Sequence, residues 1–182
     1  PKGVSVPHRA AVNFLTSMQR EPGISAGDRL LAVTTLSFDI ALLELMLPLT
    51  VGACVVLASR DQAMDADALE RLIREERITL LQATPATWGM LVGSGWQGAP
   101  GLKALCGGEA LPVELAESLL SRVGELWNMY GPTETTVWST CCRITEPRSR
   151  ITIGKPIANT TVWILDPAGH RCPIGVLGEL CI

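Results

Sequence analysis

The sequence predicts an α/β fold in which helices cover a largely parallel sheet and a β-rich segment follows. Short apolar runs alternate with helix-length patterns through the first part of the chain, as in strand–helix–strand units. Apolar residues make up 47% and charged residues 18% of the 182 residues, which is a globular composition. From about residue 143, strand patterns are joined by Gly/Pro turns instead. We therefore expect an α/β part over 1–142 and the start of a β-rich part over 143–182.

The individual elements follow from periodicity and turn residues. Residues 65–76 form an amphipathic helix pattern, with apolar side chains on one stripe and charged side chains opposite. Pro85 suits the first turn of another helix, and an amphipathic helix begins near His8. Strands are expected at 29–34, 53–57, 78–82, 103–106 and 125–129, then at 136–143, 161–165 and 177–182, and further helices at 40–49, 85–92 and 112–122.

Composition excludes several classes of protein. The net charge of −3 argues against a nucleic-acid-binding surface, which is normally basic. The longest apolar run, 40–51, is interrupted by Glu44 and Pro48 and is too short to span a bilayer, and no signal-peptide pattern is visible. The six cysteines form no CxxC pair and there are only two histidines, so we expect no zinc site and a reduced, cytoplasmic protein.

Polar or glycine-rich residues follow four of the expected strands. These sets are 37–39, 82–84, 107–109 and 128–134. In open α/β sheets, ligands bind at the carboxyl ends of the strands. We therefore expect the four sets to face one crevice.

The set at 130–134 has the most specific chemistry. Gly131 and Pro132 bend the chain directly after a strand. Tyr130 offers a flat face for a nucleobase, Thr133 a hydroxyl, and Glu134 a carboxylate suited to a hard cation such as Mg²⁺. Each residue alone is typical of a surface turn, but the ordered set indicates a nucleotide site.

The run Asn128-Met129-Tyr130-Gly131-Pro132-Thr133-Glu134 resembles the hallmark motif of the adenylation domains of nonribosomal peptide synthetases, which are acyl-adenylate-forming enzymes. The resemblance extends along nearly the whole chain. It includes Pro1-Lys2-Gly3-Val4 (the end of a phosphate loop), Ser37-Phe38-Asp39, Gly107-Gly108-Glu109-Ala110, 153–157 and 175–182. It implies that the chain is part of the large N-terminal subdomain of such an enzyme.

The resemblance also implies roles in ATP binding. Tyr130 would stack on adenine, with the backbone of Gly108, Glu109 and Ala110 on the other side of the base. Asn128 would hydrogen-bond the adenine amino group, next to the Gly131 turn. Three residues would serve catalysis: Thr133 at the α-phosphate, Glu134 holding Mg²⁺, and Lys2 close to the triphosphate.

Asp39 is expected to bind the ammonium group of an amino acid. A carboxylate between Phe38 and Ile40 is costly to bury without a cationic partner. The alternative is that Asp39 caps the following helix. The apolar neighbours and the family resemblance favour the ammonium partner.

Matching to the family gives further residues of the amino-acid pocket, each of which taken alone could be ordinary core. The bulky members would leave little volume beyond the α-carbon, and steric exclusion of this kind favours a small substrate. The pattern resembles that of glycine-activating domains, with alanine as the next candidate. These residues are Ile40, Leu43, Gln82, Leu105, Gly107, Met129, Val137 and Trp138.

The implied reaction joins a carboxylate to the α-phosphorus of ATP, and the aminoacyl-adenylate then passes to the phosphopantetheine thiol of a carrier domain. Carrier and condensation domains of the same synthetase are the implied partners. The chain starts at Pro1 and stops within the strand pattern at 177–182. We interpret it as a piece truncated at both ends, and we expect it to be inactive by itself.

Three alternatives stay open. An acyl- or aryl-CoA ligase of the same superfamily would have no ammonium to pair with Asp39. A non-enzymatic α/β binding module would not need ligand-facing motifs at four successive strand ends. A degenerate, inactive adenylation domain would keep the same sequence pattern.

Overall fold

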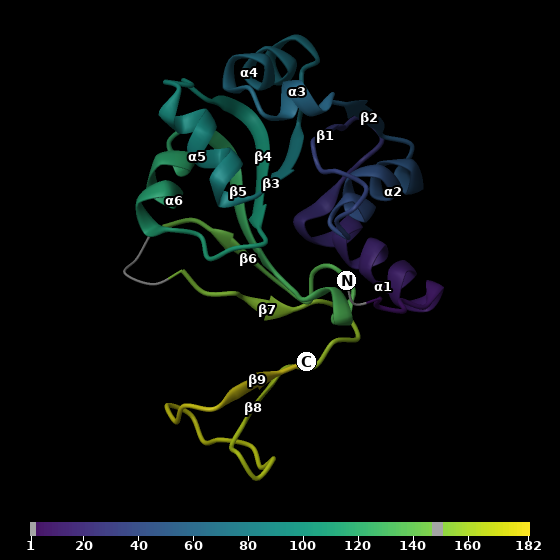
Figure 1. Cartoon of the computed structure of the whole chain (residues 1–182), viewed down its shortest axis with the longest axis vertical. Helices are drawn as coiled ribbons and strands as arrows, with labels where there is room; N and C mark the ends of the chain where they lie inside the picture. Colours follow the sequence, from purple (N-terminus) through teal and green to yellow (C-terminus); the bar gives the residue numbers. More distant parts are fainter. Residues whose placement is uncertain (1–2, 147–150) are drawn as a thin grey trace.

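The computed structural model describes residues 3–146 and 151–182. Strands β1–β7 form one sheet of order β2-β1-β3-β4-β5-β6-β7, and β8 pairs only with β9 (Figure 1). The strands are β1 (Arg29–Ala32), β2 (Cys54–Leu57), β3 (Leu80–Ala83), β4 (Ala99–Gly107), β5 (Val123–Tyr130), β6 (Thr140–Ile144), β7 (Lys155–Pro156), β8 (Trp163–Leu165) and β9 (Glu179–Cys181).

Pairing within the main sheet is parallel from β1 to β5 and antiparallel for β6 and β7. The predicted class, a largely parallel sheet covered by helices with β-rich structure after it, is therefore confirmed. The main sheet continues past residue 143 through β7, and only β8 and β9 form the separate sheet.

Helices cover both faces of the main sheet (Figure 1). Side chains of α4, α5 and α6 pack with one set of strand residues, including Leu81 and Cys106. Side chains of α1 and α2 pack with the alternate set, including Leu80 and Leu105, because successive strand side chains point to opposite faces. The helices are α1 (His8–Met18), α2 (Ala41–Val51), α3 (Arg60–Ala63), α4 (Ala66–Glu75), α5 (Pro85–Gly93) and α6 (Val113–Leu120).

Side-chain caps fix where several helices begin. The Asp65 carboxylate accepts a hydrogen bond from the Ala68 amide at 2.7 Å, which starts α4. Thr84 caps α5, and Pro85 occupies its first position, so both predicted helices are confirmed. The short helix α3 was not predicted, although Ser59 and Gln62 form a capping box there.

Some predicted boundaries are wrong. The strand expected at 136–143 begins only at Thr140, because Thr136 and Val137 have left-handed φ values of 72° and 65°. The strands expected at 103–106 and 125–129 are longer and begin at Ala99 and Val123. Pairing with neighbouring strands extends these segments beyond the apolar runs that the sequence displays.

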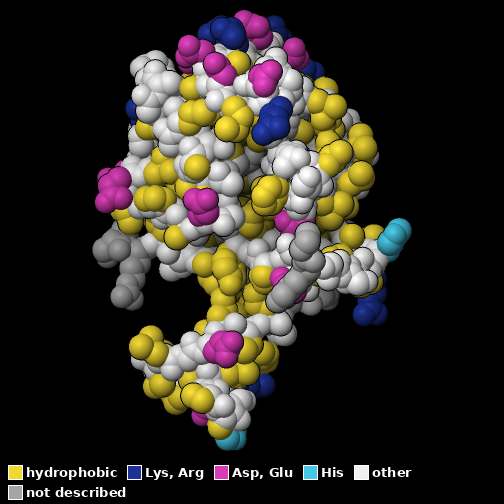
Figure 2. Space-filling model, in the orientation of Figure 1, with side chains coloured by type: hydrophobic (Ala, Val, Ile, Leu, Met, Phe, Trp, Pro, Cys, Tyr) yellow, Lys and Arg dark blue, Asp and Glu magenta, His cyan; other side chains and the backbone are white. Residues whose placement is uncertain are grey.

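The β8–β9 sheet extends away from the main body and carries exposed apolar side chains (Figure 2). Ile174 and Leu177, in the connection between its strands, are almost fully exposed. A two-stranded sheet is marginally stable by itself, so its register depends on few contacts. None of the helices in the described ranges is long and apolar enough to cross a membrane.

Candidate nucleotide and substrate site

The sheet order brings the four predicted ligand-facing sets to one edge. Strands β1, β3, β4 and β5 are successive neighbours and all parallel, so their carboxyl ends meet on the same side. The register places Cys106 opposite Asn128 and Gly107 opposite Met129. The loop after β4 therefore lies beside the end of β5.

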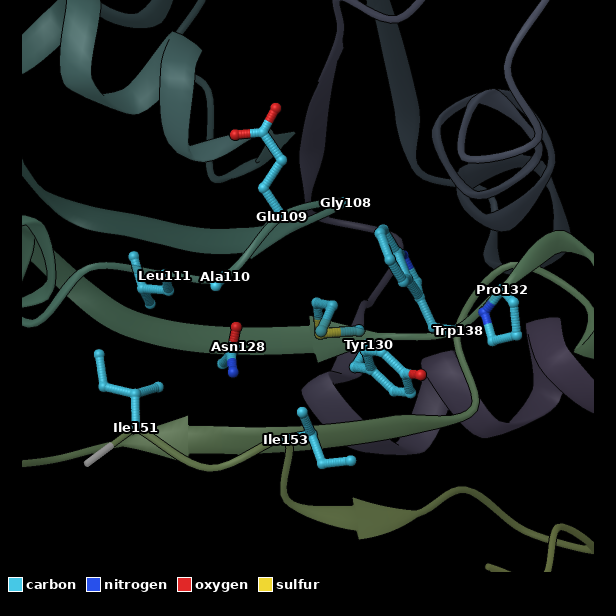
Figure 3. Close-up of a pocket in the computed structure, with 12 residues that line it drawn as sticks. Gly108, Glu109, Ala110, Leu111, Asn128, Tyr130, Pro132, Trp138, Ile151 and Ile153 are labelled. Carbon is cyan, nitrogen blue, oxygen red and sulfur yellow. The ribbon is translucent and has the colours of Figure 1, made fainter. Parts of the chain in front are cut away.

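A pocket of about 400 Å³ opens between these two strand ends (Figure 3). It contains every residue predicted to lie at the base, together with Gly131 and with Met129 and Trp138 from the predicted amino-acid set. Thr133 and Glu134, predicted at the phosphates, are not in its lining. Three further lining residues, Leu111, Ile151 and Ile153, were missed, and Pro132, which was predicted to form the turn, also lines the pocket. Two of them lie in the connection before β7, which the sequence places far from the motif. The predicted residues in the lining are Gly108, Glu109, Ala110, Asn128, Met129, Tyr130, Gly131 and Trp138.

Asn128 is buried in the wall of this pocket with its amide orientation fixed. Its Nδ2 donates a hydrogen bond to the carbonyl of Thr152 at 2.9 Å, and the side chain is only 6% exposed. The Oδ1 atom is thereby left as an acceptor facing the pocket (Figure 3). An acceptor at this position suits an exocyclic amino group such as that of adenine.

The remaining walls suit a flat, mostly apolar ring. Tyr130 is 37% exposed at the end of β5, and the backbone after β4 runs opposite it. The Glu109 carboxylate points away from the pocket (Figure 3), so that residue contributes backbone rather than charge. Ile151 and Ile153 form the remaining side. The residues present therefore fit a nucleobase.

Thr133 and Glu134 lie beside the nucleobase pocket, on a 3₁₀ turn at Thr133–Thr135. Both are exposed, and Glu134 lines a separate cavity of about 290 Å³ with Ser5 and Asn159. Within the described ranges, no three His, Cys, Asp or Glu residues gather as metal ligands. A single carboxylate suits Mg²⁺, which keeps waters and takes phosphate oxygens as ligands. The predicted Lys2 lies outside the described residues.

The turn that follows has strained backbone. Thr136 and Val137 are both β-branched and both have positive φ, a conformation that is costly for such residues and often found at functional sites. Gly131 permits the turn, because a Cβ there would lie 2.4 Å from the Val137 oxygen and 2.7 Å from the Trp138 Cα. Trp138, which follows this strained turn, forms part of the pocket wall.

Gln82 joins the predicted amino-acid residues through a buried hydrogen-bond network. Its Oε1 accepts from Trp138 Nε1 at 2.8 Å. Its Nε2 donates to the Ile40 carbonyl and to Glu44 Oε1, both at 2.9 Å. Gln82 and Trp138 are almost fully buried, so the amide has one orientation that satisfies all its partners.

Glu44 anchors this network and was not predicted as a site residue. It is fully buried in α2, where Oε2 accepts from the backbone amides of Val33 and Thr34 and Oε1 also accepts from the Thr34 hydroxyl. Burial raises the pKa of the Glu44 carboxyl, and the hydrogen bonds from Thr34, Gln82 and Val33 oppose that rise. The available signal was a carboxylate within the apolar run at 40–49, since such a group requires buried partners.

Asp39 precedes α2 and is partly exposed. Its side chain does not cap the helix, for which Ile40 is the capping position without a side-chain hydrogen bond. Within the described parts of the chain, the Asp39 carboxylate has no hydrogen-bonding or ionic partner. The helix-capping alternative is therefore wrong, and the carboxylate is free to bind a cation.

The other predicted amino-acid residues occupy different environments. Leu43, Leu105 and Val137 are buried in the core that α1 and α2 share with the sheet, and Ile40 packs against that core. Gly107 leaves space for its neighbours, because a Cβ there would lie 2.7 Å from Trp138 Cη2. The structure thus links Gln82, Ile40 and Trp138 directly, while Asp39 and the core residues have no contact with the nucleobase pocket.

The fold and the pocket together define an α/β protein with a nucleobase-sized pocket at the carboxyl ends of its parallel strands. The model of the AMP-binding enzyme family matches residues 1–182, and the chain belongs to that family.

Similar proteins include a PKS-NRPS hybrid synthetase and two nonribosomal peptide synthetases, one of them a solved structure. The hybrid synthetase acdB of Aspergillus candidus is 47% identical over 183 residues, covering all of this chain and 7% of that protein. A dimodular nonribosomal peptide synthase of Bacillus subtilis is 45% identical, again over the whole chain and 8% of its own length. A four-domain nonribosomal peptide synthetase solved with AMP and glycine superimposes with a TM-score of 0.96 at 49% identity, over 99% of this chain and 14% of that one. The chain thus spans a small part of the proteins it matches.

Proposed function

We propose that this chain forms the base-binding and substrate-selecting part of a domain that activates an amino acid with ATP, within a nonribosomal peptide synthetase. The observation that carries the proposal is the pocket in which the Asn128 Oδ1 acceptor faces the space beside Tyr130. Synthetases solved with AMP and with AMPPNP are similar to this chain, which supports ATP as the nucleotide.

Each residue then has a chemical task. Tyr130 and the backbone at 108–110 hold the base, and Asn128 accepts from its amino group. Thr133 and Glu134 lie on the turn beside that pocket, where the hydroxyl would meet the α-phosphate and the carboxylate would hold Mg²⁺. The cation neutralises phosphate charge. Because both reactants are anions, positioning and charge neutralisation provide most of the catalysis.

The proposed amino-acid substrate is glycine. Asp39 has a carboxylate without a partner in the described residues, as an ammonium-binding group requires. Gln82 and Trp138 are buried and hydrogen-bonded to each other, and as a wall of the amino-acid site they would leave little room for a side chain. The similar structure bound to AMP and glycine supports the same choice. The activated glycine would then pass to a phosphopantetheine thiol on a carrier domain, with a condensation domain as a further partner.

The test is amino-acid-dependent exchange of pyrophosphate into ATP by the intact synthetase. Glycine should give the highest kcat/KM, alanine less, and valine or an acid without an amino group almost none. Asp39→Ala should reduce exchange with glycine at least about a hundredfold, because a desolvated charge pair is lost. Asp61→Ala, at an exposed position of α3, is the matched control.

Two results would contradict the proposal. Preference for a large amino acid would exclude the glycine pocket. Activation of a fatty or aryl acid that is unaffected by Asp39→Ala would indicate a ligase for plain carboxylic acids.

A further inference from the structure

The Gln82 amide can satisfy its hydrogen-bonding partners in only one orientation, and Glu44 determines that orientation. A carboxylate is an acceptor without donors when ionised, and Glu44 already receives the amides of Val33 and Thr34. It therefore requires the Nε2 end of the Gln82 amide. That orientation leaves Oε1 for the Trp138 indole N–H. The opposite orientation would set N–H against N–H at Trp138 and oxygen against oxygen at Glu44.

The network connects two sides of the proposed amino-acid site. On one side, Gln82 Nε2 also binds the Ile40 carbonyl, one residue after Asp39. On the other side, Trp138 has its N–H held by Gln82 while its Cη2 lies over Gly107, where a Cβ would be 2.7 Å away. The ring lies toward Gly108, the residue that follows β4 (Figure 3). The indole is thus held at both ends.

We propose that Glu44 is a positioning residue that orients the Gln82 amide. Through that amide, Glu44 fixes the Trp138 ring relative to the segment before α2 that contains Asp39. This inference rests on the proposed function. The depth of the amino-acid pocket is the separation between the ammonium-binding carboxylate and the indole wall. Hydrogen-bond polarity, in addition to side-chain bulk, sets that depth. Glu44 itself lies behind Gln82 and touches no substrate.

Two substitutions separate polarity from bulk. Glu44→Gln keeps the shape and lets an amide oxygen receive the Val33 and Thr34 amides, but then sets a donor against Gln82 Nε2. Gln82→Met keeps an unbranched side chain of similar length and removes every hydrogen bond of the amide. Glu75→Gln, the same chemical change at an exposed position of α4, is the control.

The experiment measures kcat/KM for glycine and alanine, and KM for ATP, in the intact synthetase. Both Glu44→Gln and Gln82→Met should raise the alanine-to-glycine ratio about tenfold, within the range that one methylene group can supply. The double variant should change the ratio no more than either single variant, because Glu44 and Gln82 act through the same series of hydrogen bonds. KM for ATP should change less than this ratio, because Trp138 is only one of the residues that line the nucleobase pocket. Every constant of Glu75→Gln should stay at the wild-type value.

The opposite outcomes are equally clear. An unchanged ratio in Gln82→Met would mean that Gln82 acts by bulk alone, and an equal fall for both substrates in Glu44→Gln would mean a structural role; either overturns the inference. If Glu44→Gln does not fold, Thr34→Val removes one donor to the same carboxylate, and an unchanged ratio there overturns it as well. Absence of amino-acid exchange in the wild type would instead refute the proposed function.

Discussion

At the scale of the residue, the orientation of the Asn128 amide determines which of its atoms faces the pocket. The Thr152 carbonyl accepts a hydrogen bond from its Nδ2, and the residue is buried in the pocket wall. The Oδ1 acceptor of this amide is therefore left to face the pocket. The motif in the sequence predicts an asparagine at this point, but only the fold brings Thr152, 24 residues along the chain, to orient it.

Replacement of Asn128 by alanine should weaken discrimination between nucleobases. The wild type should prefer ATP to inosine triphosphate, whose base has an oxygen in place of the amino group. Asn128→Ala should lower kcat/KM for ATP by about tenfold to a hundredfold, the value of one buried hydrogen bond, and lower the ATP-to-inosine-triphosphate ratio. Pyrophosphate exchange by the intact synthetase measures both constants. Gln97→Ala, at an exposed amide, is the control, and an undiminished ratio in Asn128→Ala would refute the role.

At the scale of elements, the turn between β5 and β6 carries residues proposed to bind the nucleotide and leads into a residue proposed to bind the substrate. It holds Thr133 and Glu134 on a 3₁₀ turn and then passes through two β-branched residues with positive φ. The Tyr130 carbonyl accepts from the Ser139 amide at 2.8 Å, which closes the turn. The positive φ values are maintained because strands of the main sheet fix the chain on both sides of the turn.

Gly131 should be irreplaceable in this turn. In Gly131→Ala, the new Cβ would meet the backbone of Val137, Trp138 and Ser139 at 2.4–2.7 Å, and the free energy of unfolding should fall by about 1–3 kcal/mol. Gly89→Ala, inside α5 where a Cβ would meet nothing within 4 Å, should instead raise it by about 0.5–1 kcal/mol. Denaturant unfolding of both variants tests the contrast. Equal effects would contradict the packing at Gly131.

At the scale of the whole molecule, the sheet order determines what the motifs can do together. Parallel β1, β3, β4 and β5 lie side by side, so their loops share one edge. Helices bury both faces of the sheet, which leaves that edge for ligands. The same burial controls the chemistry of the cysteines, which are all free thiols.

Two thiols should resist alkylation in the folded protein. Burial, with a smaller effect of Glu109, raises the pKa of Cys106 to about 12. Burial, with Glu21 and Cys142, raises the pKa of Cys141 to about 11. Because the thiolate reacts, iodoacetamide at pH 8 should leave both unmodified and label the partly exposed cysteines, as mass spectrometry would show. All six should react in denaturant, and rapid labelling of Cys106 before unfolding would contradict its burial.

The sequence by itself determined the alternation of strands and helices, the helix starts at Asp65 and Pro85, and the residues of the nucleobase pocket on β5 and after β4. These depend on local periodicity, capping and an ordered motif, all of which are properties of neighbouring residues. The sequence also predicts a substrate set that includes Gln82 and Trp138, which are hydrogen-bonded although they lie 56 residues apart.

Only the tertiary structure decided how those residues are connected. It shows that β7 belongs to the main sheet and that β6 begins at Thr140. It also shows that Ile151 and Ile153 line the pocket and that Glu44 accepts a hydrogen bond from Gln82. The physical reason is that strand pairing, backbone strain and the satisfaction of buried polar atoms depend on partners far along the chain. A carboxylate within an apolar helix pattern indicates that hydrogen-bond donors are needed, but only the fold shows which residues provide them.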